Sequence, residues 1–410
     1  MNKTVYVLGA GVNKAINTPS TAPRCSPFLL DDFFQVALQM RIGTYSTETY
    51  DNRLSQLYNY INKYWKKNKA DLVAEPFNLE ECFTLLELQL NEAEKNNSLE
   101  TLQELNTILY ILTSLIREVL SDFQEYGFNH SILMQQFGRI LYKEKPNILT
   151  FNYDFFIERA LENASGVNES TDRRTENDEV GHSYWNWNRP LAYGLKFDEV
   201  MLHDGAKGNA RKCIEGEKFY SHDRNKLYSD LCILKLHGSL NWFQYLPLSP
   251  IQNMPEEKTR AAYEQRKQRV ILTEVAHPVG AGYYPPNKDQ LYLHPLIITP
   301  IIHKDIYLED KEVHGRVFSP LWTKAKDCLS KCNKLVIIGY SFPATDFLTK
   351  KLFLESFVDN KLDELIIVNP DDSVIHKVTD LCHFQDPTRY KDVSEFIRRI
   401  MPADETFQDK

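Results

Sequence analysis

A histidine followed by a glycine stands where an apolar run ends, in the segment LKLHGSLNW (Leu234–Trp242). The imidazole of His237 can accept a proton near neutral pH, because the pKa of a free histidine side chain lies close to that value. At the mouth of a sheet such a group can serve as a general base for a bound ligand. A plain turn, or a buried histidine with a structural role, is the alternative interpretation.

Two glycines follow the first apolar run, TVYVL (residues 4–8), as Gly9-Ala10-Gly11. Glycines at these positions let a backbone turn tightly and approach a pyrophosphate, while the N–H groups of the next helix attract its charge. Lys14 stands where the GxGxxG fingerprint has its third glycine. The pair is therefore half of a dinucleotide fingerprint, and a tight turn explains it nearly as well.

Small, amide or hydroxyl groups also follow four later apolar runs that are rich in β-branched residues. In a parallel sheet the carboxyl ends of all these strands meet at one edge, where ligands bind. We therefore expect a single crevice, although Asn152 is also a fair helix N-cap. The crevice would be lined by Gly9 to Asn13, Asn152, Asp154, His237, Gly238, Gly339, Tyr340, Ser341 and Asn369.

Strand-like runs alternate with helical patterns in the second part of the chain, which predicts a Rossmann-like, mostly parallel α/β sheet. Strands are expected within residues 4–8, 146–154, 231–239, 295–300, 334–341 and 364–370, and helices at 319–332 and 345–357. Residues 164–182 and 243–290 are interpreted as loops, the second with an exposed mixed-charge helix near 256–269. The aromatic segment 183–194 is expected to form a hairpin packed on the core.

The residues between the first two strands form a large helical block. From Leu99 to Leu120, apolar residues three and four apart form one continuous stripe. We expect residues 1–28 and 146–390 to form the sheet domain, 29–145 a helical insertion or second subdomain, and 391–410 a C-terminal helix and tail. The compact first βαβ unit of a nicotinamide dehydrogenase closes within about 30 residues and does not fit this spacing.

The composition limits the class of protein. The chain has 410 residues and a net charge of −8, which argues against a protein that coats nucleic acid along its whole surface. It contains no run of about 18 apolar residues, so no membrane association is expected. The N-terminus lacks the features of a signal peptide, which favours a cytoplasmic location. The cysteines form no CxxC pair, and no metal is expected.

Taken together and in order, the motifs GAGVN, TFNYD, KLHGS, GYSFPATD and IVNP resemble the motif series of sirtuins. The segment LLDDFF (Leu29–Phe34), after a Pro-rich coil, resembles the zinc-less sirtuin-like NADases of bacterial anti-phage defence systems. The resemblance implies a sirtuin-type sheet that binds NAD as its substrate. It covers residues 4–14, 147–160, 231–240 and 334–372.

The resemblance also implies roles for single residues. Asn152 would orient the nicotinamide ribose and the attacking water, and His237 would act as general base on a ribose hydroxyl. Asp154, the third catalytic candidate, would support the site or touch the nicotinamide side. NAD would be held by Gly9, Ala10, Gly11, Val12, Asn13, Asn152, Gly339, Tyr340, Ser341, Asp346 and Asn369.

The sequence departs from the protein deacylases among the sirtuins. It lacks their four-cysteine zinc module, Phe151 replaces the glutamine before the asparagine, and Asn13 stands where serine is usual. Cleavage of the nicotinamide–ribose bond passes through an oxocarbenium-like state, as in other glycoside cleavages. A site that admits water in place of an acyl-lysine oxygen would release nicotinamide and ADP-ribose.

Three functions remain open at this point. The first is an NAD+ hydrolase that depletes NAD in infected cells. The second is an NAD-dependent deacylase or ADP-ribosyltransferase, and the third is a non-catalytic sensor of NAD or ADP-ribose. The resemblance further implies a homo-oligomer and an activating partner encoded in the same operon, such as a HerA-type DNA-translocating ATPase or an Argonaute.

Overall fold

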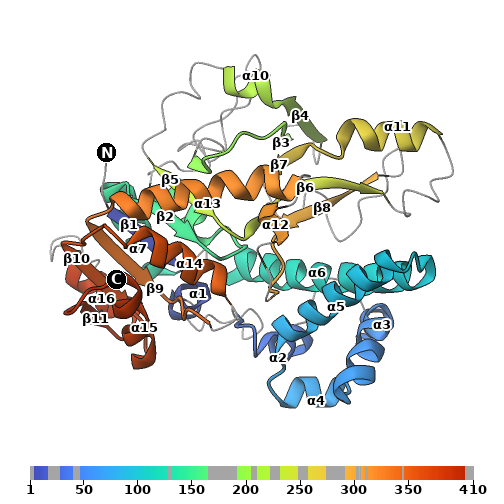
Figure 1. Cartoon of the computed structure of the whole chain (residues 1–410), viewed down its shortest axis with the longest axis horizontal. Coiled ribbons are helices and arrows are strands. Elements are labelled where there is room, and N and C mark those ends of the chain that lie inside the picture. Colours follow the sequence, from blue (N-terminus) through green and yellow to red (C-terminus); the bar gives the residue numbers. More distant parts are fainter. Residues whose placement is uncertain are drawn as a thin grey trace. The chain divides into compact units, whose positions relative to one another are not determined.

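The computed structural model describes residues 4–16, 28–39, 47–127, 131–164, 192–204, 210–221, 231–247, 257–273, 291–301, 304, 306–309, 313–343 and 346–401. They belong to two compact units (Figure 1). The first unit comprises residues 1–16, 131–297 and 305–410, and the second comprises 17–130 and 298–304. None of the helices within these ranges is long and apolar enough to cross a membrane.

The first unit contains a six-stranded sheet in which every neighbouring pair is parallel. The spatial order is β11-β10-β9-β1-β2-β5, so along the chain the strands run 6-5-4-1-2-3, the order of a doubly wound Rossmann-like fold. The predicted mixed α/β class and mostly parallel sheet are thus confirmed. The strands are β1 (Thr4–Leu8), β2 (Asn147–Thr150), β5 (Cys232–Lys235), β9 (Lys334–Ile338), β10 (Glu364–Val368) and β11 (Thr388–Tyr390).

Helices of this unit follow several of these strands. The helices predicted at 319–332 and 345–357 are α13 (Val313–Lys331) and α14 (Phe347–Ser356). Helix α7 (Ile132–Glu144) packs against α8 (Phe156–Ala164) and belongs to the sheet unit, although the sequence grouped it with the helical block. The remaining helices are α1 (Ala10–Ile16), α10 (Gly216–Ser221), α11 (Glu257–Arg266), α12 (Ile306–Glu309), α15 (Asp372–Cys382) and α16 (Val393–Ile400).

A second, mixed sheet corrects the interpretation of residues 243–290 as a loop. Its order is β4-β3-β7-β6-β8. The apolar run at 295–300 overlaps β8, which pairs antiparallel with β6 and therefore lies outside the parallel sheet. The strands are β3 (Glu199–Asp204), β4 (Ala210–Glu215), β6 (Gly238–Pro247), β7 (Val270–Thr273) and β8 (Leu291–Ile297). The predicted loop at 164–182 and most of the predicted hairpin at 183–194 lie outside the described residues.

The two sheets are joined by one continuous segment, because only Leu236 and His237 separate β5 from β6. Gly238 follows this turn with φ +85°, a conformation that L side chains rarely adopt. A Cβ atom at Gly238 would lie 2.2 Å from the carbonyl oxygen of Leu296 in β8. The glycine after the histidine is therefore required by the turn and by the close approach of β8.

The described elements of the second unit are helices, and its core is rich in aromatic rings. Phe34 packs edge-on against Phe33 and Phe77, with ring centroids 5.1 and 5.4 Å apart. The stripe of α6 buries leucine, isoleucine and valine side chains, including Leu112, Leu115 and Val119. The helices are α2 (Phe33–Gln39), α3 (Thr47–Trp65), α4 (Lys69–Ala74), α5 (Leu79–Lys95) and α6 (Leu99–Gly127).

Candidate functional site

The last residues of five strands form one row across the parallel sheet. Leu8 pairs with Thr150 on one side and with Ile338 on the other. Thr150 pairs with Lys235, and Ile338 pairs with Val368. The five segments expected to line a crevice therefore leave the sheet at the same edge, in the order β10, β9, β1, β2 and β5.

The direction of the chain connections reverses between β1 and β9, which is the position where open α/β sheets bind their ligands. Here the loops after the two strands touch, and the Gly11 N–H donates to the Gly339 oxygen over 2.9 Å. A Cβ atom at Gly9 or Gly11 would lie 2.6 or 2.8 Å from that oxygen. Gly339 has φ +64°, and its Cβ would lie 2.3 Å from the nitrogen of Val12. The packing of these loops against each other thus explains all three glycines.

Asn152 and Asp154 lie in the turn between β2 and α8. The Asn152 amide donates from Nδ2 to the Gly9 carbonyl over 3.1 Å, which ties the end of β2 to the loop after β1. The N-terminus of α8 is capped instead by Asp154, whose Oδ1 accepts the Phe156 N–H over 2.8 Å. Its Oδ2 accepts from Nδ2 of the buried Asn13 over 2.6 Å. The helix cap that the sequence suggested for Asn152 is therefore supplied by Asp154.

The carboxyl group of Asp154 is itself buried. This burial raises its pKa above the ordinary value of 3.8, while the nearby ammonium of Lys235 and the hydrogen bonds from Phe156 and Asn13 act in the opposite direction. Because both oxygens accept hydrogen bonds from the protein, the carboxyl group is suited to hold the turn. Such a group has little capacity left to contact a ligand directly.

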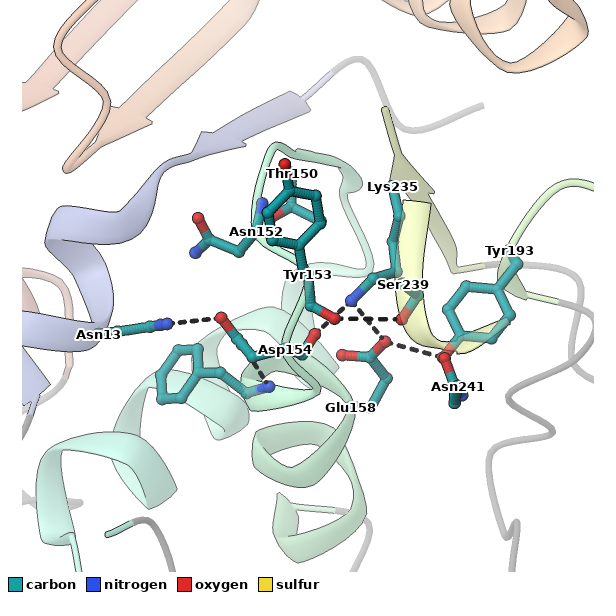
Figure 2. Close-up of polar contacts among 11 residues, drawn as sticks. Asn13, Thr150, Asn152, Tyr153, Asp154, Glu158, Tyr193, Lys235, Ser239 and Asn241 are labelled. Carbon is teal, nitrogen blue, oxygen red and sulfur yellow. Dashed lines mark hydrogen bonds and ion pairs between the residues drawn. The ribbon is translucent and has the colours of Figure 1, made fainter. Parts of the chain in front are cut away.

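A buried ion pair that the sequence analysis missed lies beside this turn (Figure 2). Nζ of Lys235 lies 3.2 Å from Oε1 of Glu158, and both side chains are 1% exposed. The same ammonium donates to the backbone carbonyl of Asp154. The Tyr193 hydroxyl donates to Oε1 of Glu158 over 2.8 Å and accepts from Nδ2 of Asn241 over 3.3 Å. A lysine within the apolar run LCILKL was the signal that could have revealed the pair.

His237 is 7% exposed and lies among aromatic rings. The Phe151 ring and the imidazole pack edge to face with a centroid distance of 5.0 Å, and Trp322 of α13 stacks beside the imidazole at 6.5 Å. Trp322 donates from its indole nitrogen to the carbonyl of Leu236 over 3.0 Å, which fixes the residue before the histidine. The imidazole is thus held in a defined place at the end of β5.

Phe151 and Tyr340 form a stacked pair, here named the aromatic roof, with ring centroids 4.3 Å apart and planes inclined by 18°. Phe151 follows β2 and Tyr340 lies just beyond β9, and both strands flank β1. Cα of Tyr340 would lie 2.7 Å from a Cβ atom on Gly9, so the tyrosine packs directly on the loop after β1. Its hydroxyl donates to Asp346, which is buried and therefore anchors the roof.

The remaining predicted residues lie at the same edge with different exposure. Ser341 is exposed, and Ala10, Gly11, Asn152 and Asn369 are half-buried. Asn369 donates from Nδ2 to the Tyr340 carbonyl over 3.4 Å, while its Oδ1 accepts the Asp371 N–H over 3.0 Å. Val12 is buried inside α1. Among the described residues, no group of three or more His, Cys, Asp or Glu side chains is arranged to hold a metal ion.

The chain was also compared with known proteins. No family model matches it. A search of curated proteins gives no match either.

Proposed function

We propose that this chain is a sirtuin-type NAD+ hydrolase that cleaves the nicotinamide–ribose bond and releases nicotinamide and ADP-ribose. The observation that carries the proposal is the row of five strand ends at the switch point of a parallel sheet with Rossmann-like order. Dinucleotides bind at switch points of this kind. The ordered resemblance to zinc-less sirtuin-like NADases supports the same substrate, and in this proposal the helical unit that includes residues 17–130 is an insertion in such a core.

The groups at this edge fit a dinucleotide. The half-buried Ala10, Gly11 and Asn152 and the exposed Ser341 present backbone and side-chain polar atoms near the switch point. Within the described part of the chain, no hydrogen-bond donor reaches Oδ1 of Asn13, although this atom is buried. A ribose hydroxyl would supply such a donor, as would a bound water.

The proposed reaction assigns one step to each side chain. Asn152 orients the nicotinamide ribose and a water molecule with its amide. His237 accepts a proton as the water oxygen forms a bond to the ribose carbon, and nicotinamide leaves with the electron pair of the broken bond. Asp154 does not contact the substrate in this mechanism; its carboxyl group accepts hydrogen bonds from Asn13 and from the start of α8 and so holds both in place. NAD+ and water thus give nicotinamide, ADP-ribose and a proton.

The biological setting is part of the proposal and depends on the sequence resemblance alone. In that setting the chain acts as an effector that depletes NAD during phage infection. It assembles as a homo-oligomer and is activated by a partner encoded beside it, a DNA-translocating ATPase or an Argonaute.

The test is an assay of NAD consumption with product analysis, with and without the protein encoded next to this chain. Asn152→Ala and His237→Ala are compared with the matched exposed variants Asn62→Ala and His376→Ala. Wild type and both controls are expected to release nicotinamide and ADP-ribose. Removal of the base is expected to lower turnover by about 10² to 10⁴-fold, the usual contribution of general base catalysis.

Two results would contradict the proposal. If NAD stays intact in every mixture while an acylated peptide loses its acyl group, the chain is a deacylase. If ADP-ribose binds tightly without turnover and His237→Ala leaves this binding unchanged, the chain is a sensor.

A further inference from the structure

The mechanism above does not use the buried ion pair between Lys235 and Glu158. Both side chains are 1% exposed, and the ammonium and the carboxylate lie 3.2 Å apart. A buried ion pair rarely stabilises a protein more than apolar residues of similar volume do, because both charges lose their hydration. Its presence beside the candidate site therefore calls for a role other than stability.

The pair belongs to a set of contacts made by residues just before and just after His237. These contacts all reach the turn between β2 and α8. Before the histidine, Lys235 donates to the backbone carbonyl of Asp154. After it, the Leu240 N–H and the Ser239 hydroxyl reach the carbonyl of Tyr153, over 3.0 and 3.4 Å. The segment that carries His237 is thus bound, before and after the histidine, to the turn that carries Asn152; Figure 2 shows the contacts of Lys235 and Ser239.

The position of the Lys235 ammonium is itself fixed. Glu158 lies in the first turn of α8, so its carboxylate is held by the helix that begins directly after the Asn152 turn. The Tyr193 hydroxyl donates to the same carboxylate oxygen over 2.8 Å. The Lys235 ammonium also lies 6.0 Å from the centre of the Phe155 ring. The pair therefore links the start of α8 to the end of β5.

We propose that Lys235 and Glu158 are positioning residues, which hold the amide of Asn152 and the imidazole of His237 in a fixed relation so that both face the same bound ribose. This inference rests on the proposed hydrolysis of NAD. Neither residue contacts the substrate; each acts through the turn between β2 and α8. Small displacements of reacting groups lower turnover more than binding, which gives the inference a distinctive kinetic signature.

The experiment compares two double variants of the full chain. The double variant Lys235→Met with Glu158→Gln removes both charges and keeps an oxygen that can accept the hydrogen bond from the Tyr193 hydroxyl. Lys235→Met alone would leave a buried carboxylate without its positive partner. The matched control is Lys304→Met with Glu80→Gln, which alters a second buried Lys–Glu pair, 3.8 Å apart, in the helical unit. Steady-state kinetics with NAD are measured together with hydrogen exchange of peptides spanning residues 151–158.

For the Lys235/Glu158 variant we expect kcat to fall by about 10- to 100-fold while KM stays within about twofold. We also expect faster exchange in residues 151–158 and unchanged exchange in β9 and β10. The control should keep wild-type kcat. An unchanged kcat, or a kcat that falls equally in both double variants, would overturn the inference.

The exchange measurement separates this inference from the proposed function. If wild type never consumes NAD but the Lys235/Glu158 variant loosens residues 151–158, the hydrolase proposal fails and the positioning of the turn stands. If exchange in this turn is unchanged, the positioning inference fails whether or not NAD is consumed.

Discussion

Replacing Gly339 by alanine tests the architecture of the switch point. Gly339 has φ +64° and faces the loop after β1, where a new Cβ would lie 2.3 Å from the Val12 nitrogen and 2.5 Å from the Gly11 carbonyl carbon. These are backbone atoms, so no side-chain rotation relieves the contact. We expect the two loops to separate and the aromatic roof, which packs on them, to move.

The magnitude follows from two contributions. A non-glycine residue held at positive φ costs about 1–3 kcal/mol, and overpacking against backbone atoms adds about 1–3 kcal/mol. Gly194→Ala is the matched control, because Gly194 has φ +72° and the nearest described atoms to its Cβ would belong to two side chains, Leu234 and Lys324, at 3.0 Å. The two variants should therefore differ by about 1–3 kcal/mol, the overpacking contribution alone.

Urea unfolding followed by tryptophan fluorescence measures this difference, since Trp242 and Trp322 are buried in the sheet unit. The same variants are assayed for NAD turnover, and Gly339→Ala should lose more activity than Gly194→Ala. Equal unfolding midpoints for the two variants would refute the close approach of the loops after β1 and β9.

Three further predictions concern the side chains around this edge. Phe151→Ala removes one of the two rings of the aromatic roof and should lower the free energy of unfolding by about 3–5 kcal/mol. It should also lower the KM for NAD, because the end of β1 is uncovered. A variant that loses stability but keeps the wild-type KM would show that the roof does not limit access. Because burial raises the pKa of Asp154, its contribution to stability is fully present below the unfolded-state value of 3.8 and is lost as the pH rises through the higher folded-state pKa. Asp154→Asn should therefore gain stability relative to wild type as the pH rises above 3.8. A stability difference between the two proteins that does not change with pH in urea unfolding would contradict this. Trp322→Phe leaves the Leu236 carbonyl without its donor and should cost about 1–3 kcal/mol by the same measurement; a loss below about 0.5 kcal/mol would argue against that hydrogen bond.

The strands of the parallel sheet could be predicted because they are buried on both faces. Strands β1, β9 and β10 each begin with a half-buried residue and then continue with four buried ones, so an unbroken apolar run marks them in the sequence. Strand β11 carries the sequence TRY with exposed or half-exposed side chains and lies at the sheet edge. It has no apolar signal and was missed.

The second sheet could not be predicted from local patterns. Strand β7 has only four residues, and β6 pairs with β7 and β8 across long intervening segments. The run at 295–300 has the same apolar character that a parallel strand would have, and composition alone does not indicate which sheet a strand joins. Pairing between segments that are distant in the sequence decides which sheet each strand joins.

The candidate site was predictable where it depends on strand order and unpredictable where it depends on the direction of side chains. The edge formed by Gly9, Asn152, His237 and Asn369 follows from parallel strands that end in one row. The stacking of Phe151 on Tyr340 joins rings from the segments that follow β2 and β9, a contact that the spacing of residues along the chain does not reveal.

The direct passage from β5 into β6 has a consequence for how the two sheets are connected. Strand β6 has ten residues, its first residue is bonded to His237, and its pairing with β8 is irregular between Gly238 and Phe243. Ser239 and Leu240, at the start of this strand, contact the carbonyl of Tyr153. The first residues of the second sheet are therefore bonded to the same turn that follows β2 in the first sheet.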